Sequence, residues 1–272
     1  NRASMFSPDG DWQAQIESRI GWHQRIREAL DQGLFVLHAQ PILDLHSDEV
    51  SQYELLLRMV GPDGELIAPS VFLDIAERSG LILDIDRWVV RRAIQLLAEH
   101  EAAGHPIRLE VNLSGRAFAD RELLTIIQED LIYYGVDPAN LVLEVTETAA
   151  IANIGEAQTF VRTLQAMGCG FALDDFGVGF SSFSQLKHLP VDYLKIDGSF
   201  VQDLAGNTVD QHLVQAIVSV ARGLGKMTIA EFVGDGETVR LLKEYGVDYA
   251  QGYYIAQPGP LPNTAPDVGV AA

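Results

Sequence analysis

The chain has 272 residues, of which 47% are hydrophobic and 21% charged, a composition typical of a globular protein rather than a disordered one. Its 38 acidic residues outnumber its 19 basic ones, and the formal charge of -19 argues against a protein that binds nucleic-acid polymers through their phosphates. The single cysteine, Cys169, excludes an internal disulfide framework and a site of several thiolates. We therefore expect a reducing compartment, the cytoplasm.

No stretch of the sequence approaches about 18 uninterrupted apolar residues, and the first residues lack the pattern of a cleaved signal. We expect a module that makes no membrane contact. Because the chain begins at Asn1 rather than at a methionine, we expect an excised fragment. A membrane anchor, a sensor domain or a cyclase-like domain elsewhere in a parent protein stays open.

The predicted elements begin with an amphipathic helix over residues 12–31, which ends at Gly33 and leads in from a preceding domain. Strand patterns at 35–45 and 50–60 flank turn-forming residues, which predicts a hairpin. From there strands alternate with helices, which requires parallel strands joined by crossovers. The later strands are expected at 107–113, 141–145, 170–173, 193–196, 227–232 and 249–252, and the helices at 86–103, 121–134, 155–167, 208–224 and 237–245.

These eight strands in a chain of this length favour a (β/α)8 TIM-like barrel over an open doubly wound sheet. The glycine fingerprint of dinucleotide-binding sheets is absent from the sequence. We predict a linker helix over residues 1–33, a barrel over 34–260 and a flexible tail over 261–272.

Polar side chains lie near the ends of nearly all predicted strands, where barrels carry their catalytic groups. One acidic residue after a strand is commonly a helix cap or a solvated charge. Several carboxylates at one barrel mouth would repel each other unless a cation relieved them, and oxygen ligands suit Mg2+ or Mn2+. None of the seven histidines lies in a recognisable metal-ligand motif, which disfavours zinc. The polar set comprises Glu54, Arg58, Asn112, Glu144, Glu147, Asp174, Asp175, Lys195, Asp197, Glu231 and Gln251.

Adjacent Asp174 and Asp175 point to opposite faces of a strand unless a sharp turn brings both to one site. Gly177 and Gly179 supply the freedom for such a turn, and two ions about 3.5 to 4 Å apart would then fit between the aspartates. A capped turn without metal is the alternative. Lys195, inside a strand among carboxylates, is a candidate to orient or deprotonate an attacking water or to stabilise charge on a phosphate.

Eight short motifs follow one another in a characteristic order. They are Gln40-Pro41-Ile42, Glu54-Leu55-Leu56-Leu57-Arg58, Val111-Asn112-Leu113-Ser114, Glu144-Val145-Thr146-Glu147, Asp174-Asp175-Phe176-Gly177, Lys195-Ile196-Asp197, Ala230-Glu231 and Gln251-Gly252-Tyr253. In type and order they resemble the motifs of the EAL-domain phosphodiesterases, which linearise cyclic di-GMP. The resemblance runs from about residue 35 to residue 258.

The resemblance implies hydrolysis of cyclic di-GMP to linear pGpG in bacterial signalling, with two Mg2+ or Mn2+ ions, in a barrel whose first strand is antiparallel to the others. It also implies a homodimer through the helix-rich region after the Asp175 loop. The implied metal ligands are Glu54, Asn112, Glu144, Asp174, Asp175 and Glu231, and the implied catalytic residues are Lys195, Glu231 and Asp175. Gln40, Arg58, Asp197, Gln251 and Pro258 would bind the dinucleotide, and Glu147 would brace the loop after Asp175.

The chain departs from the family pattern at four places. Leu55 replaces the alanine of the family name, His38-Ala39 replaces an aromatic pair, Val178 replaces a frequent threonine, and Phe232-Val233-Gly234 replaces Gly-Val-Glu. Every implied metal ligand and the lysine are nevertheless present.

Two other functions stay open. A receptor that binds cyclic di-GMP without hydrolysing it would pass a signal through the N-terminal helix, although a pure receptor does not require the whole acidic set. A metal-dependent barrel enzyme acting on a sugar phosphate is the third possibility, because the residues that would contact the ligand do not exclude it.

Overall fold

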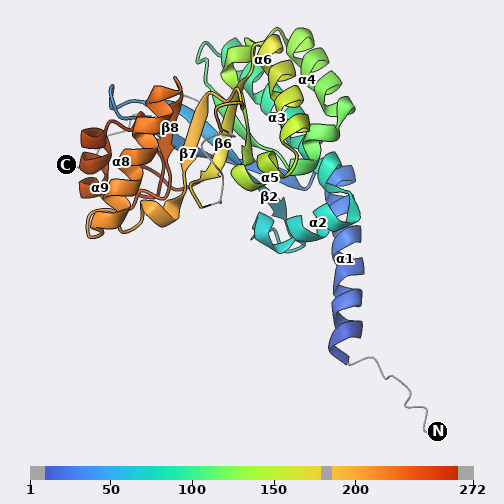
Figure 1. Ribbon diagram of the computed structural model, residues 1–272. Helices are drawn as coiled ribbons and strands as arrows, with labels where there is room; N and C mark the ends of the chain where they lie inside the picture. Colours follow the sequence, from blue (N-terminus) through green and yellow to red (C-terminus); the bar gives the residue numbers. More distant parts are fainter. Residues whose placement is uncertain (1–9, 179–185, 263–272) are drawn as a thin grey trace. The chain divides into compact units, whose positions relative to one another are not determined.

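A computed structural model describes residues 10–178 and 186–262 (Figure 1). The chain forms two compact units. The first unit comprises Asn1–Val36 and Leu57–Ile85, and the second comprises Leu37–Leu56 and Asp86–Ala272.

The second unit contains a closed barrel. Within the described residues its strands follow the order β1, β9, β8, β7, β6, β5, β4 and β2, and β2 pairs back to β1. Neighbouring strands are parallel from β2 round to β9, whereas β1 is antiparallel to β9. This confirms the predicted barrel with an inverted first strand. The strands are β1 (Phe35–Asp44), β2 (Val50–Val60), β4 (Leu109–Asn112), β5 (Leu141–Thr146), β6 (Gly170–Phe176), β7 (Tyr193–Ile196), β8 (Met227–Ala230) and β9 (Tyr249–Ala250).

Helices cover the outside of this barrel. Figure 1 shows α4 and α6 side by side on one side of the strands, and α8 with α9 on the other. Their apolar faces are buried while their polar faces meet water, as expected for helices that cross over between parallel strands. The helices are α3 (Ile82–Ala102), α4 (Arg121–Tyr134), α5 (Glu147–Ala152), α6 (Ile154–Met167), α8 (Thr208–Gly223) and α9 (Gly236–Tyr245).

The first unit contains α1 (Gly10–Gln32), β3 (Leu66–Ile67) and α2 (Leu73–Ser79). The predicted N-terminal helix is confirmed, and Gly33 follows it with a φ of 69°, the left-handed conformation that ends many helices. Helix α1 packs against α2, and the rings of Phe35 and Phe72 lie 5.8 Å apart. The sequence patterns missed β3 and α2, which are short.

The side chains inside the barrel form two levels, because alternate residues of a strand point to the same face. The lower level is apolar on β1 and on β5 to β8: Ile42, Val142, Ala172, Tyr193 and Ile229 form one buried cluster. The residue two positions further along each parallel strand is polar and faces the same interior. The upper level therefore contains Glu144, Asp174, Lys195 and Glu231.

The chain after β9 returns to the barrel. Gly259 and Ala39 exchange two backbone hydrogen bonds, of 2.7 and 3.0 Å, and the Pro262 carbonyl lies 3.0 Å from Nε2 of His100. The rest of the predicted tail, residues 263–272, lies outside the described residues. Among the described residues, no helix combines the length and the hydropathy needed to cross a bilayer.

Replacing Ile229 by alanine should lower the free energy of unfolding by about 2 to 5 kcal/mol, because it opens a cavity in the apolar level of the barrel. Val209→Ala is the control, since Val209 is 67% exposed and its truncation should change stability by about 0.5 kcal/mol or less. Urea unfolding followed by circular dichroism measures both. Equal effects of the two substitutions would contradict this picture of the core.

Candidate active site

A buried lysine occupies the centre of the upper level. Nζ of Lys195, on β7, lies 2.8 Å from Oε2 of Glu144 on β5 and 3.0 Å from Oε1 of Glu231, just after β8. It also lies 3.4 Å from Glu54 on β2 and 3.7 Å from Asp174 on β6. The Lys195 side chain is 0% exposed. Four carboxylates from four strands thus meet at one ammonium group.

Amide side chains complete the ring around Glu54. Nδ2 of Asn112 donates to one oxygen of Glu54 at 2.7 Å, and Nε2 of Gln251 donates to the other at 2.5 Å. The Gln251 amide also donates to Oε1 of Gln40 at 3.0 Å, and Gln40 donates to the Ala256 carbonyl at 3.1 Å. These bonds fix the orientation of Glu54 and connect β1, β2, β4 and β9 at the same end of the barrel.

The adjacent aspartates reach one site because β6 is irregular at its end. The pairing of β6 with β7 shifts register between Leu173 and Phe176, and Asp175 has a φ of 53°. The turn is therefore made by Asp175 itself and by Gly177, whose φ is 105°, while Gly179 lies outside the described residues. A bulge of this kind re-aims side chains beside active sites.

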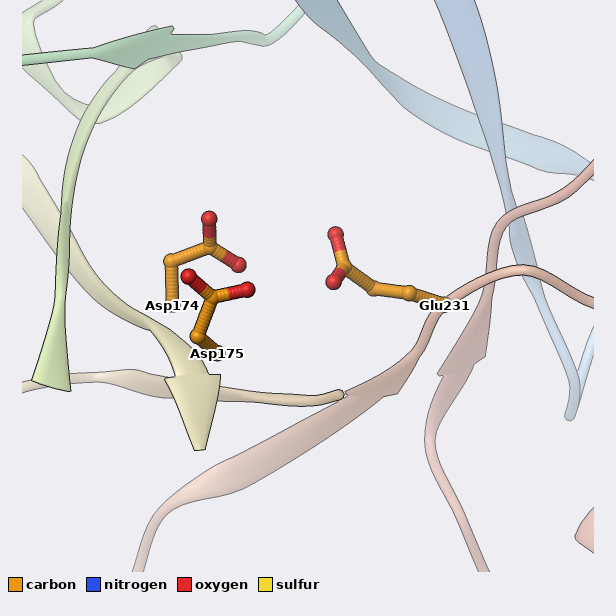
Figure 2. A group of neighbouring side chains, drawn as sticks. All are labelled: Asp174, Asp175 and Glu231. Carbon is orange, nitrogen blue, oxygen red and sulfur yellow. The ribbon is translucent and has the colours of Figure 1, made fainter. Parts of the chain in front are cut away.

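As a result, oxygens of Asp174, Asp175 and Glu231 lie within 4.8 Å of one another. Figure 2 shows the two aspartate carboxylates side by side at the end of β6, facing Glu231 across the opening. This is a group of ligands that a single cation could bridge.

The charges at the centre of the site depend on each other. Burial alone would lower the pKa of Lys195, but the surrounding carboxylates raise it well above its usual value, so the amine is a cation. Burial would likewise raise the pKa of Glu54, yet Lys195 and the two amide donors lower it. Lys195 and Glu54 are therefore a stable pair of opposite charges.

Three other carboxylates of the site have raised pKa values, because burial and nearby negative charges disfavour their charged form. Burial, with the charges of Glu54 and Asp174, raises the pKa of Glu144 well above its usual value. Burial, again with nearby carboxylates, raises the pKa of Glu231 to about 8 and that of Asp175 to about 6. One ammonium group does not balance so many negative charges in a buried site.

The donor set fits divalent cations. Five carboxylates and one ammonium leave four negative charges when all are ionised, which two divalent cations would neutralise. Within the described residues, Oε1 of Glu144 is buried and meets no hydrogen-bond donor, and Oδ1 of Asp174 has only the Lys195 ammonium 3.7 Å away. Buried oxygens without donors are costly, and hard cations prefer such ligands.

The other predicted residues lie around this centre or outside it. Oε2 of Glu147 accepts from the backbone N–H of Gly177 at 3.1 Å, just after the aspartates. Asp197 follows Lys195 by two residues and caps the next turn, accepting from the Ser199 N–H at 2.8 Å. Pro258 precedes Gly259, which pairs with Ala39 beside Gln40. Arg58 belongs to the first unit, where its guanidinium donates to the Leu57 carbonyl at 2.8 Å.

Sequence reasoning overlooked two buried polar residues inside the barrel. Glu110 and Gln52 are both 0% exposed, and Nε2 of Gln52 donates to Oε1 of Glu110 at 2.6 Å. Glu110 lies two positions before Asn112, and Gln52 lies two positions before Glu54. Each therefore shares the inward face of a predicted site residue. Alternation along the strands was the signal that would have found them. Burial raises the pKa of Glu110 to about 7.

The sequence model of the EAL domain matches residues 23–258, which is most of the chain. The chain belongs to the EAL domain family. This confirms the resemblance seen in the motifs, and all eight motifs lie within the matched residues.

Two relatives of known name show the extent of the similarity. The chain is 36% identical to the cyclic di-GMP phosphodiesterase PdeF of Escherichia coli (strain K12) over 256 residues, which are 94% of this chain and 34% of PdeF. It is 38% identical to the cyclic di-GMP phosphodiesterase PdeB of Shewanella oneidensis over 241 residues, 88% of this chain and 28% of PdeB. The chain therefore spans about a third of the length of these relatives.

Solved EAL structures share the fold. The Xanthomonas citri FimX EAL domain in complex with c-diGMP matches with a TM-score of 0.86 and 37% identity, covering 92% of this chain and 97% of that one. The PaMucR phosphodiesterase in its c-di-GMP complex matches with a TM-score of 0.83 and 35% identity, covering 88% of this chain and 98% of that one.

Replacing Lys195 by methionine in this EAL domain should lower the free energy of unfolding by about 3 to 5 kcal/mol in EDTA, because the buried carboxylates lose their cation. Lys187→Met, at an exposed lysine, is the matched control and should change little. Chemical denaturation measures both variants. If the two were equally stable, Lys195 would not be the ion that holds the site together.

Proposed function

We propose that this EAL domain hydrolyses cyclic di-GMP to linear pGpG with the help of two divalent cations, Mg2+ or Mn2+. The observation that carries the proposal is the convergence of four carboxylates from four strands on one buried lysine. Relatives whose names describe this activity, and EAL structures that hold this dinucleotide, support it.

The upper level of the barrel would hold the ions. Bound there, divalent cations would neutralise the phosphate charge and activate a water for in-line attack. Neutralising the carboxylates would also remove the repulsion that an anionic ligand meets at this site, although the chain as a whole has a formal charge of -19. The ligands would be Glu54, Asn112, Glu144, Asp174, Asp175 and Glu231.

The chain's own residues would position the reactants. The ammonium of Lys195 would orient the attacking water or stabilise charge on the phosphate, with Glu231 and Asp175 facing the same space. Oε1 of Gln251 is buried and lacks a hydrogen-bond partner among the described residues, so it can accept from a ligand donor. Gln40, linked to Gln251, and Asp197, at the turn that follows β7, would contact the dinucleotide.

Two further assignments rest on similarity to the family more than on contacts. We propose that Arg58 and Pro258 bind the dinucleotide and that the domain forms a homodimer through the helix-rich region after Asp175, which sedimentation of the chain would test. The single cysteine favours a reducing compartment, and we propose that the domain acts in the cytoplasm, joined to a sensor or cyclase-like domain.

Purified chain should convert cyclic di-GMP to pGpG in Mg2+ or Mn2+ and lose this activity in EDTA. Asp174→Asn should lower kcat/KM about a hundredfold or more, because it removes a negative charge from the proposed metal ligands. Asp203→Asn, at an exposed aspartate, is the control and should keep full activity. Chromatography of the products measures the activity of the parent chain and of both variants.

Tight binding without turnover would instead favour the receptor. Calorimetry with cyclic di-GMP separates these outcomes, since a receptor would bind the dinucleotide in the presence of Mg2+ or Mn2+ without releasing pGpG. Turnover of a sugar phosphate, with neither binding nor hydrolysis of the dinucleotide, would favour the third possibility.

Glu147→Ala should lower kcat about tenfold or more, because the turn after the aspartates loses a hydrogen bond to a charged acceptor, worth about 1.5 to 3 kcal/mol. Glu147→Gln keeps an acceptor oxygen and should retain more activity. Glu156→Ala removes an exposed glutamate from α6 and is the control. Steady-state kinetics would reject the bracing role if the alanine variant at 147 matched this control.

A further inference from the structure

Phe232 adopts a backbone conformation that a bulky residue rarely accepts. Its φ is 55°, in the left-handed region that favours glycine. Glycine is also the residue that the family pattern usually places after the glutamate. Strained residues of this kind cluster at active sites and ligand-binding segments, which makes the Phe232 side chain a candidate for a role there.

The Phe232 ring is exposed yet its backbone is held in place. Phe232 is 60% exposed, whereas the next residue, Val233, is fully buried. The Val233 N–H donates to the Gln251 carbonyl at 2.9 Å, and the Val233 carbonyl accepts from the Tyr254 N–H at 3.1 Å. The ring is therefore presented to solvent from a fixed segment rather than from a free loop.

Two glycines leave room for this segment. A Cβ atom at Gly198 would lie 2.3 Å from Cδ2 of the Phe232 ring, and one at Gly252 would lie 2.2 Å from the backbone of Val233. The ring thus lies directly against the turn that follows β7, and this contact restricts its rotamers.

The position of the ring relates it to the reaction site. It directly follows Glu231, whose carboxylate lies 3.0 Å from Lys195, and it rests on Gly198, which directly follows Asp197. A phosphate held among the carboxylates would leave its nucleoside to extend toward the rim of the barrel. A planar apolar ring at that rim offers a surface for a base, whose faces stack on aromatic side chains.

We propose that the ring of Phe232 stacks on one guanine base of cyclic di-GMP and so contributes to substrate affinity. The inference rests on the proposed function, since it names a contact to the same substrate. It predicts an effect on binding rather than on the chemical step, because the ring carries no group that can transfer a proton or bind a cation.

The decisive comparison uses Phe232→Gly and Phe232→Trp. Glycine suits the backbone conformation, so this variant should fold at least as stably as the parent while KM rises between about fivefold and a hundredfold with kcat within twofold. Tryptophan keeps a stacking surface and should keep KM near the parental value. Tyr133→Ala, at a ring that is 81% exposed on α4, is the control for loss of a surface aromatic and should change neither constant.

A second readout is independent of turnover. The Phe232→Trp variant should lose fluorescence when a nonhydrolysable phosphorothioate analogue of cyclic di-GMP is added, because a stacked guanine quenches indole. The chain's own three tryptophans supply the baseline, which is measured on the parent protein and subtracted.

Each other outcome overturns the proposal. Parental KM in the glycine variant, or an equal loss of affinity in the tryptophan variant, would exclude stacking while leaving the hydrolase intact. A fall in kcat alone would assign the ring to the geometry of the site, and a change in sedimentation alone would assign it to a protein interface. If the parent chain neither hydrolyses nor binds the dinucleotide, the proposed function itself fails, and the stacking proposal with it.

Discussion

The ammonium of Lys195 is the interaction on which the upper half of the barrel depends. It is fully buried and lies within 3.7 Å of four carboxylates from different strands, so it is the point at which β2, β5, β6 and β8 are joined electrostatically. Burying an unpaired charge is costly, and each of these ions is tolerable only because the others are present. Fully ionised, the cluster has more negative than positive charges, which is the balance that suits the proposed binding of cations.

The kind of side chain inside the barrel changes along the barrel axis. The lower interior is filled by apolar side chains such as Ile229 and Val142, and the upper interior by ionisable ones. The same strands supply both levels, because positions two residues apart face the same way. The apolar level supplies the hydrophobic stabilisation that offsets the cost of crowding carboxylates above it. Glu110 and Gln52 extend polar character below the level of Asn112 and Glu54, and they satisfy one another in part by a hydrogen bond.

Local strain at strand ends shapes the mouth of the barrel. Asp175 and Phe232 both adopt a positive φ, and they stand beside Asp174 and Glu231, two of the residues that converge on the lysine. Positive φ costs energy for residues other than glycine, more so for a bulky ring than for aspartate. Surrounding hydrogen bonds hold both turns, one through Glu147 and one through the backbone of Gln251. These bonds hold the two strand ends that carry Asp174 and Glu231.

Local patterns in the sequence were sufficient to predict the fold class and most of its strands and helices. The strand at 193–196 and the helix at 121–134 have the predicted bounds, because apolar periodicity and the flanking aspartate and glycine caps are properties of adjacent residues. The predicted strand at 227–232 instead ends at Ala230, since Phe232 turns out of the sheet, and the helix α5 after Thr146 was missed because it is short.

The ordered motifs likewise identified the family from sequence alone. Only the tertiary structure decided that the distant carboxylates meet at Lys195, that Asp175 makes its own turn, and that Arg58 belongs to a different compact unit from Glu54. Distances between strands and the register of their ends arise when the sheet closes, and no local pattern encodes them.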